Sequence, residues 1–199
     1  MKKHDVYTVI ETGQELFQSQ GYFNTGTEEI LERSGYPRSS FYYHFKSKEG
    51  FAIQVLENYG ESTAAFYREH LFGDPDAEPV DRIWSFIEGM IDLAVERDFK
   101  SECLVQKFSI ECAGMNENLR VATQKQINKM LDVLEECVLE GQQNGEIRED
   151  LESREVAELI QSQLFGSFIL GRLSGDGVGM KKSLKCTVGY VQKLNNELS

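Results

Sequence analysis

Residues 22–50 read Tyr-Phe-Asn-Thr-Gly-Thr-Glu-Glu-Ile-Leu-Glu-Arg-Ser-Gly-Tyr-Pro-Arg-Ser-Ser-Phe-Tyr-Tyr-His-Phe-Lys-Ser-Lys-Glu-Gly. Thr25 and Glu28 have the spacing of a capping box, which predicts that a short helix starts directly after the threonine. Gly35 is a turn residue that can adopt a positive φ, and a second short helix is expected over 38–44. Two short helices around a glycine turn predict a helix-turn-helix, whose second helix enters the major groove of DNA.

Helical periodicity continues on both sides of this segment. Val6, Ile10, Gly13 and Leu16 recur at helical spacing and predict a first helix that ends near Gly21. Further helices are predicted over 48–71, 80–97, 102–113, 116–143, 154–173 and 180–197. No alternating strand bounded by turn residues is found. The expected fold class is therefore all-α with about nine helices: a three-helix DNA-binding head over 1–47 and a larger effector-binding and dimerisation domain over 48–199.

Composition and charge are those of an ordinary globular protein with an uneven charge distribution. The 199 residues are 40% hydrophobic and 27% charged, and the formal net charge is −12. Residues 1–50 carry six basic and seven acidic side chains, so nearly all of the net negative charge belongs to 51–199. Because an acidic body is repelled by DNA, contact with DNA is expected to be confined to the head.

Several other function classes find no support in the sequence. The chain begins without the apolar core of a signal peptide and has no apolar run of about 20 residues, so a cytoplasmic protein outside the membrane is expected. Four cysteines, at 103, 112, 137 and 186, are too widely spaced for a zinc site, and neither a metal nor a cofactor is predicted. No catalytic triad or carboxylate pair stands out, so an enzyme is not expected. Two alternatives stay open: a helical adaptor or ligand-binding protein without DNA binding, and a cysteine-dependent enzyme.

Residues 6–57 resemble the tetracycline-repressor (TetR) family. The resemblance is carried by Gly21-Tyr22, by Gly35 and above all by the aromatic block Ser40-Phe41-Tyr42-Tyr43-His44-Phe45-Lys46-Ser47-Lys48-Glu49. The family implies a homodimer that binds a palindromic operator and is released from DNA by a small-molecule effector, which is apolar or electrophilic here.

A narrower resemblance is to the subgroup that controls reductases of electrophiles and reactive aldehydes, such as repressors of the N-ethylmaleimide-reductase type. In that subgroup a cysteine within Gly-Cys-Leu senses reactive species. Cys103 occupies the position of that cysteine, although Glu102 replaces the glycine. Arg172 stands where one member has a lysine partner for the thiol, and arginine cannot be deprotonated to bond sulfur. Cys103 is therefore either a sensor thiol, with Lys100 or Lys107 lowering its pKa, or a small apolar packing residue.

The expected DNA contacts lie on and around the second helix of the motif. Arginine can donate two hydrogen bonds to guanine, hydroxyls suit base edges or phosphates, and a helix N-terminus favours a phosphate. Phe41 and Phe45 are assigned to the core of the head. The predicted DNA-binding residues are Thr25, Thr27, Arg38, Ser39, Ser40, Tyr42, Tyr43, His44 and Lys48.

The remaining helices are expected to bind the effector and to form the dimer. An aromatic and apolar pocket is predicted from Tyr59, Phe66, Trp84, Ile87, Met90, Cys103, Phe108, Cys112, Phe165, Phe168 and Ile169. Apolar stripes and small residues on the last two helices favour a four-helix interface between two subunits, with burial inside one subunit as the alternative. The predicted interface residues are Leu159, Gln163, Ser167, Gly171, Leu184, Val188 and Val191.

Overall fold

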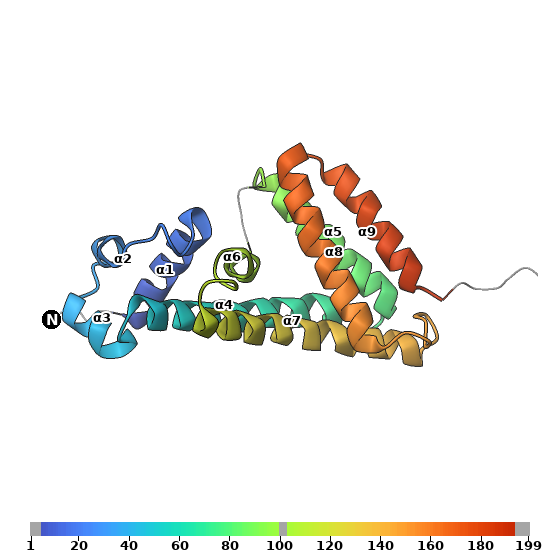
Figure 1. Ribbon diagram of the computed structural model, residues 1–199. Helices are drawn as coiled ribbons and strands as arrows, with labels where there is room; N and C mark the ends of the chain where they lie inside the picture. Colours follow the sequence, from blue (N-terminus) through green and yellow to red (C-terminus); the bar gives the residue numbers. More distant parts are fainter. Residues whose placement is uncertain (1–4, 100–102, 194–199) are drawn as a thin grey trace, which may run out of the picture. The chain divides into compact units, whose positions relative to one another are not determined.

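The computed structural model describes residues 5–99 and 103–193, and these residues form nine α-helices and a single isolated antiparallel bridge, between Ile147 and Gln192 (Figure 1). The predicted all-α class is confirmed. The helices are α1 (Val6–Gln20), α2 (Thr27–Ser34), α3 (Arg38–Phe45), α4 (Lys48–Phe72), α5 (Pro79–Glu96), α6 (Leu104–Glu111), α7 (Glu117–Gln143), α8 (Ser153–Ser174) and α9 (Gly177–Val191).

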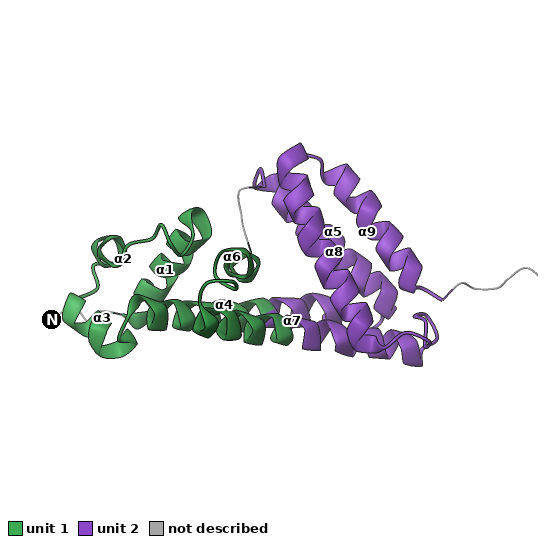
Figure 2. Cartoon of the chain, viewed as in Figure 1, with its two compact units in different colours: residues 1–63, 101–129 green, residues 64–100, 130–199 purple. Residues whose placement is uncertain are grey.

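The chain divides into two compact units (Figure 2). The first comprises residues 1–63 and 101–129, and the second comprises 64–100 and 130–199. Both α4 and α7 contribute residues to each unit. These compact units differ from the functional domains expected from the sequence, 1–47 and 48–199. The boundary between those functional domains stays a prediction.

The core of the first unit is built from aromatic rings on α1, α3, α4 and α6. The ring centroids of Phe17 and Phe108 are 5.6 Å apart, and those of Phe41 and Phe51 are 5.0 Å apart. All four side chains are fully buried, each worth about 1.5–3 kcal/mol of apolar burial. A Cβ on Gly13 would lie 2.4 Å from the Phe51 ring, so the close approach of α1 to α4 requires glycine there.

In the second unit α9 packs against both α5 and α8 (Figure 1). Two glycines permit these contacts: a Cβ on Gly171 would lie 2.1 Å from the sulfur of Met180, and one on Gly177 would lie 2.5 Å from Val95. Leu184 on α9 is fully buried. The last two helices are therefore packed closely within one chain.

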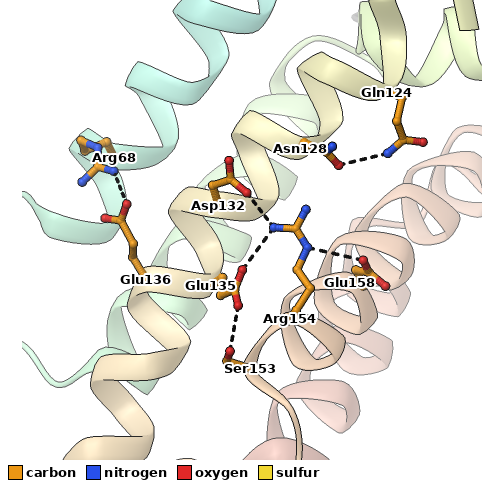
Figure 3. A network of polar contacts seen from close by, with 9 residues as sticks. All are labelled: Arg68, Gln124, Asn128, Asp132, Glu135, Glu136, Ser153, Arg154 and Glu158. Carbon is orange, nitrogen blue, oxygen red and sulfur yellow. Dashed lines mark hydrogen bonds and ion pairs between the residues drawn. The ribbon is translucent and has the colours of Figure 1, made fainter. Parts of the chain in front are cut away.

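A polar network ties the start of α8 to α7 within the second unit (Figure 3). The Arg154 guanidinium points to three carboxylates, at 2.7 Å from Asp132, 3.2 Å from Glu135 and 3.4 Å from Glu158. The Ser153 hydroxyl donates to Glu135 over 2.8 Å. Because these groups are partly exposed, the network contributes little stability for each ion pair but defines how the two helices meet.

The predicted capping box at α2 is wrong. The N-cap residue is Gly26, and no side chain caps the helix. Thr25 is buried, and its hydroxyl donates instead to the carbonyl of Gly21 over 2.6 Å. Glu28 pairs with Arg38. The threonine thus stabilises the turn between α1 and α2, because its side chain hydrogen-bonds to the backbone of that turn and not to the N-terminus of α2.

The predicted boundaries of the last helix, 180–197, are also wrong. The helix starts three residues earlier because the side chain of Asp176 accepts a hydrogen bond from the N–H of Gly179 over 2.9 Å and caps it. It ends at Val191, where the chain passes into the isolated bridge. The glycine-rich stretch after residue 174 therefore ends α8 at Gly175 but also contains the first residues of α9.

Candidate nucleic-acid interface

Helix α3 separates a buried face from an exposed one. Gly35 ends α2 with φ of 63° and ψ of 18°, the left-handed conformation expected of a glycine at this turn. Phe41 and Phe45 are buried in the core of the unit, as predicted, whereas 73% of Tyr43 is exposed. Ser40 is half-buried. The other predicted contacts of this helix are exposed: Arg38, Ser39, Tyr42, Tyr43 and His44.

Arg38 is held by two neighbours at the start of α3. Its guanidinium forms an ion pair with the carboxylate of Glu28 on α2, and its central carbon lies 5.7 Å from the ring centroid of Tyr42. Both charged side chains are exposed. The Glu28 carboxylate therefore occupies part of the guanidinium that the sequence predicts as a DNA contact. The sequence alone does not indicate this pair, because its two residues belong to different helices.

The start of α2 presents a mixed environment to a phosphate. Thr27 is its first residue and is half-buried, while Thr25 lies buried beneath the preceding turn. Glu28 and Glu29 occupy the first helical turn. Acidic side chains there stabilise the helix dipole, but they also repel the phosphate for which a helix N-terminus is suited.

Lys48 lies at the start of α4, where its ammonium sits 4.3 Å from the ring centroid of Tyr22 in a cation–π contact. Partial burial lowers the pKa of Lys48. Lys46, which the sequence analysis did not select, donates from its ammonium to the carbonyl of Tyr43 over 2.6 Å and lies 5.2 Å from the Tyr43 ring. Two lysines beside α3 are therefore held by aromatic residues of the head.

The end of α6 is attached to the end of α1. The Lys107 ammonium donates to the carbonyl of Gln18 over 2.9 Å, and the carboxylate of Glu111 accepts from the N–H of Tyr22 over 2.9 Å. Gly21 has φ of 85°, and a Cβ there would lie 2.2 Å from the Glu111 carboxylate. The glycine thus permits both the backbone conformation and the close approach of the carboxylate.

A second attachment joins the start of α4 to the start of α7. The carboxylate of Glu49 accepts from the side-chain amides of Asn116 and Asn118, each over 2.7 Å. These hydrogen bonds lower the pKa of Glu49. Asn116 also caps α7, because its side chain accepts from the N–H of Leu119 over 2.9 Å. Residues 107–118, here called the α6–α7 corner, therefore hold the helix-turn-helix unit at both α1 and α4.

The predicted effector residues of the first unit lie near this corner. Cys103 is the N-cap residue of α6, and its sulfur and the Tyr59 hydroxyl share a hydrogen bond. Burial raises the pKa of the Cys103 thiol, although hydrogen bonding to Tyr59 and to two backbone N–H groups opposes the rise. Phe108 and Cys112 are fully buried, and burial raises the pKa of Cys112 to about 11. Lys100 and Glu102 lie outside the described residues.

The other predicted effector residues lie in the second unit. Ile87 is fully buried, and the ring centroids of Phe66 and Phe86 are 6.2 Å apart. Trp84 lies beside the ammonium of Lys185, which is 5.8 Å from its ring. Ile169 is exposed. Half-buried members of the predicted set are Phe66, Trp84, Met90, Phe165 and Phe168.

Most of the predicted dimer residues pack inside one chain. Gln163 is exposed and Leu159 is half-buried. The members that are buried within the single chain are Ser167, Gly171, Leu184, Val188 and Val191. A different set of large apolar side chains on α8 and α9, not among the predicted interface residues, is exposed: Ile169, Leu170, Leu173, Val178 and Tyr190. Apolar periodicity alone could not separate these two faces of the same helices.

Arg172 donates from its guanidinium to the carbonyl of Phe99 over 3.2 Å. Within residues 5–99 and 103–193, no cluster of three or more histidine, cysteine or acidic side chains is arranged to hold a metal ion, and the four cysteines are free thiols. None of the described helices is long and apolar enough to cross a membrane.

Comparison with known families agrees with this geometry. The model described as "Bacterial regulatory proteins, tetR family" matches residues 9–55, which include the helix-turn-helix. The model described as "Tetracyclin repressor-like, C-terminal domain" matches residues 79–186. The two matches together cover both the head and most of the remaining helices.

Individual relatives are distant but cover most of the chain. The transcriptional repressor DhaR of Mycobacterium sp. (strain GP1) is 26% identical over 161 residues, which are 81% of this chain and 79% of DhaR. The transcriptional repressor NemR of Escherichia coli (strain K12) is 25% identical over 180 residues, 87% of this chain and 89% of NemR.

Solved structures have the same fold. The crystal structure of the reduced form of E. coli NemR has a TM-score of 0.83 at 22% identity and covers 94% of this chain and 96% of that one. The regulatory protein TetR from Rhodobacter sphaeroides has a TM-score of 0.81 at 23% identity, over 94% of this chain and 98% of that one.

Proposed function

Because this chain belongs to the tetracycline-repressor family of DNA-binding transcriptional regulators, we propose that it is a homodimeric, effector-responsive repressor of a palindromic operator. The observation that carries the proposal is α3, whose aromatic face is buried while its arginine, serine and tyrosine side chains stay exposed. The family and the relatives named above are transcriptional regulators rather than enzymes. A protein that binds chromosomal DNA acts in the bacterial cytoplasm.

A dimer is needed for the DNA-binding geometry. Two recognition helices must reach half-sites about 34–36 Å apart on one face of the duplex. The exposed apolar side chains of α8 and α9 support an interface between two copies, since Leu170, Leu173 and Tyr190 all project from this helix pair into solvent. We assign the interface to this exposed face, while the buried stripes of the same helices hold α8 and α9 together within each subunit.

The α6–α7 corner offers a route by which an effector could change DNA binding. Its contacts with Gln18, Tyr22 and Glu49 hold α1 and α4, the two helices that flank the helix-turn-helix. A ligand that favours another position of α6 would shift these contacts and the head with them. Such a ligand must bind the two arrangements with different affinities in order to release the operator.

A direct test is fluorescence anisotropy with the duplex upstream of the protein's own gene. The wild type is expected to bind with an affinity that falls steeply between about 50 and 200 mM salt. Arg38→Ala should lose about 1–3 kcal/mol of specific binding. Arg120→Ala is the matched control, because Arg120 is an exposed arginine of the same unit that pairs with Glu117 on α7.

The same titration separates the alternatives. A helical adaptor without DNA binding would show no salt-dependent affinity for any palindromic duplex, and Arg38→Ala would behave as the wild type. A cysteine-dependent enzyme would show turnover that is lost on replacing Cys103. Addition of a maleimide or a reactive aldehyde to the preformed complex tests the electrophile hypothesis, with Cys103→Ser as its control.

A further inference from the structure

The second unit contains a buried amide with one unused hydrogen-bonding group. Gln161 on α8 is 4% exposed and Tyr67 on α4 is 2% exposed. The Tyr67 hydroxyl donates to the Gln161 carbonyl oxygen, Oε1, over 2.9 Å. The amide nitrogen of Gln161, Nε2, is buried and has no hydrogen-bond partner. One end of this side chain is therefore satisfied inside the protein and the other is not.

An unpaired amide at this depth is unfavourable. Leaving a buried donor without an acceptor costs about 1–3 kcal/mol, and nearly all such groups in folded proteins are paired with protein, water or ligand. A leucine at residue 161 would fill similar space without that cost. The unused N–H group thus points to a molecule outside the chain that accepts a hydrogen bond from Gln161.

The surroundings of Tyr67, whose hydroxyl holds the amide, are aromatic. The ring of Tyr67 contacts that of Phe86 edge-on, with centroids 4.6 Å apart, and Phe86 lies 6.2 Å from Phe66. Phe66 on α4 and Phe165 on α8 remain half-buried. Partly exposed aromatic side chains beside a buried polar group are the usual lining of a site for a small apolar molecule with one polar anchor.

Charge limits the chemistry of that molecule. In the described part of the second unit the buried polar or charged side chains are Arg82, Gln161 and Ser167. Arg82 is the single cation among them, and its guanidinium lies 2.6 Å from the carboxylate of Glu140. Since the ion pair with Glu140 balances that charge, a neutral ligand suits this unit better than an anionic one.

We infer that Gln161 is the polar anchor of the effector site, and that the effector is a neutral, aromatic or otherwise apolar molecule with a hydrogen-bond acceptor such as a carbonyl oxygen. The inference rests on the proposed function, since it identifies the chemical class of the ligand that the repressor senses. Tyr67 positions the amide by donating to its oxygen, so that the nitrogen is left for the ligand.

Two compounds of similar shape test the inference without DNA. Acetophenone presents a carbonyl oxygen, and α-methylstyrene replaces that oxygen by a methylene group. Isothermal titration calorimetry of the full chain should give acetophenone the higher affinity by roughly 3- to 10-fold, the value of one net hydrogen bond. Gln161→Leu should bind both compounds equally.

Gln126→Leu is the matched control. Gln126 on α7 is also a fully buried glutamine with one unpartnered amide atom, its Oε1, but it lies in the first unit and packs against Gly60. This variant should keep the preference for acetophenone. The double variant Tyr67→Phe/Gln161→Leu removes both polar partners and retains apolar packing, so it should fold normally and also lose the preference.

The outcomes are decisive in both directions. A preference for acetophenone that persists in a folded Gln161→Leu or in the double variant overturns the inference, as does the failure of both compounds to bind the wild type at their solubility limits. Loss of the preference in both variants, with retention in Gln126→Leu, supports it. Operator binding is measured separately, so failure of the ligand site and failure of the proposed DNA-binding function are distinguished.

Discussion

At the scale of single residues, the first residue of α3 is paired with an acid on the preceding helix. The carboxylate of Glu28 holds the guanidinium of Arg38 across the turn between α2 and α3. The pair is exposed, so it contributes little to the stability of the head. Its effect is expected on DNA affinity, because the acid both occupies the arginine and repels nearby phosphates.

We predict that Glu28→Gln binds the operator more tightly than the wild type, by roughly 0.5–1 kcal/mol, because the arginine is released and a negative charge is removed. The measurement is anisotropy at several salt concentrations. Glu32→Gln is the control, since Glu32 is an exposed acid on the same helix. Equal gains in both variants would show that general charge, and not the pair with Arg38, governs the effect.

The cysteines differ in their surroundings and should differ in reactivity. Burial raises the pKa of Cys103, and it raises that of Cys137 to about 12, whereas Cys186 on α9 is exposed. Because the thiolate is the reactive form and access decides its reaction, N-ethylmaleimide at neutral pH should modify Cys186 before Cys103. Mass spectrometry of the wild type and Cys186→Ser gives the order. Faster modification of Cys103 would favour the sensor-thiol hypothesis.

At the scale of helices, the α6–α7 corner joins elements that are distant in sequence. Lys107 and Glu111, one turn apart on α6, bind a carbonyl and an N–H group at the end of α1. Glu49 binds Asn116 and Asn118 from the start of α4. Hydrogen bonds to a carboxylate are stronger than those between neutral groups, so these contacts are suited to fixing helix positions.

The Glu49 contact predicts a pH dependence of stability. Its two amide donors lower its pKa in the folded protein, so the stabilisation is present above the unfolded pKa of about 4.3 and is lost as the pH falls through the lower folded value. The wild type should therefore melt at a higher temperature than Glu49→Gln near pH 6. That difference should shrink below about pH 4. A difference that is constant with pH would assign the effect to packing instead.

At the scale of the whole molecule, one chain leaves apolar side chains of α8 and α9 uncovered. Leu173 on α8 is 82% exposed, and Val178 and Tyr190 on α9 are also exposed. Contiguous exposed apolar side chains commonly mark a surface of association. A net charge of −12 makes non-specific association of two copies unfavourable, so the proposed dimer requires a specific apolar contact.

We predict that Leu173→Glu is monomeric at micromolar concentration in sedimentation velocity and that its operator affinity falls at least about tenfold, because a charge in an apolar interface is unfavourable and a monomer reaches one half-site only. Ile110→Glu is the control, since Ile110 is 69% exposed on α6 in the other unit. A Leu173→Glu protein that still sediments as a dimer would place the interface on another surface.

Sequence reasoning succeeded where the signal is local. Apolar spacing predicted the helices, Gly35 predicted the left-handed turn, and Phe41 and Phe45 were correctly assigned to the core. The predicted cap of α2 was wrong because the Thr25 side chain can hydrogen-bond to more than one backbone group. Its hydroxyl donates to the carbonyl of Gly21, and Gly26 is the N-cap residue of α2. This hydrogen bond depends on the conformation of the chain at the end of α1.

The all-α class, the helix-turn-helix and the family can be recognised before folding is considered, because helix periodicity, turn glycines and an aromatic block are properties of neighbouring residues. The partner of Arg38, the attachments of the α6–α7 corner and the buried pair of Tyr67 and Gln161 are visible only in the folded chain. Each of these contacts joins different helices, so it exists only once packing has brought their faces together. The same packing determines which apolar side chains of α8 and α9 are buried within one chain and which stay exposed.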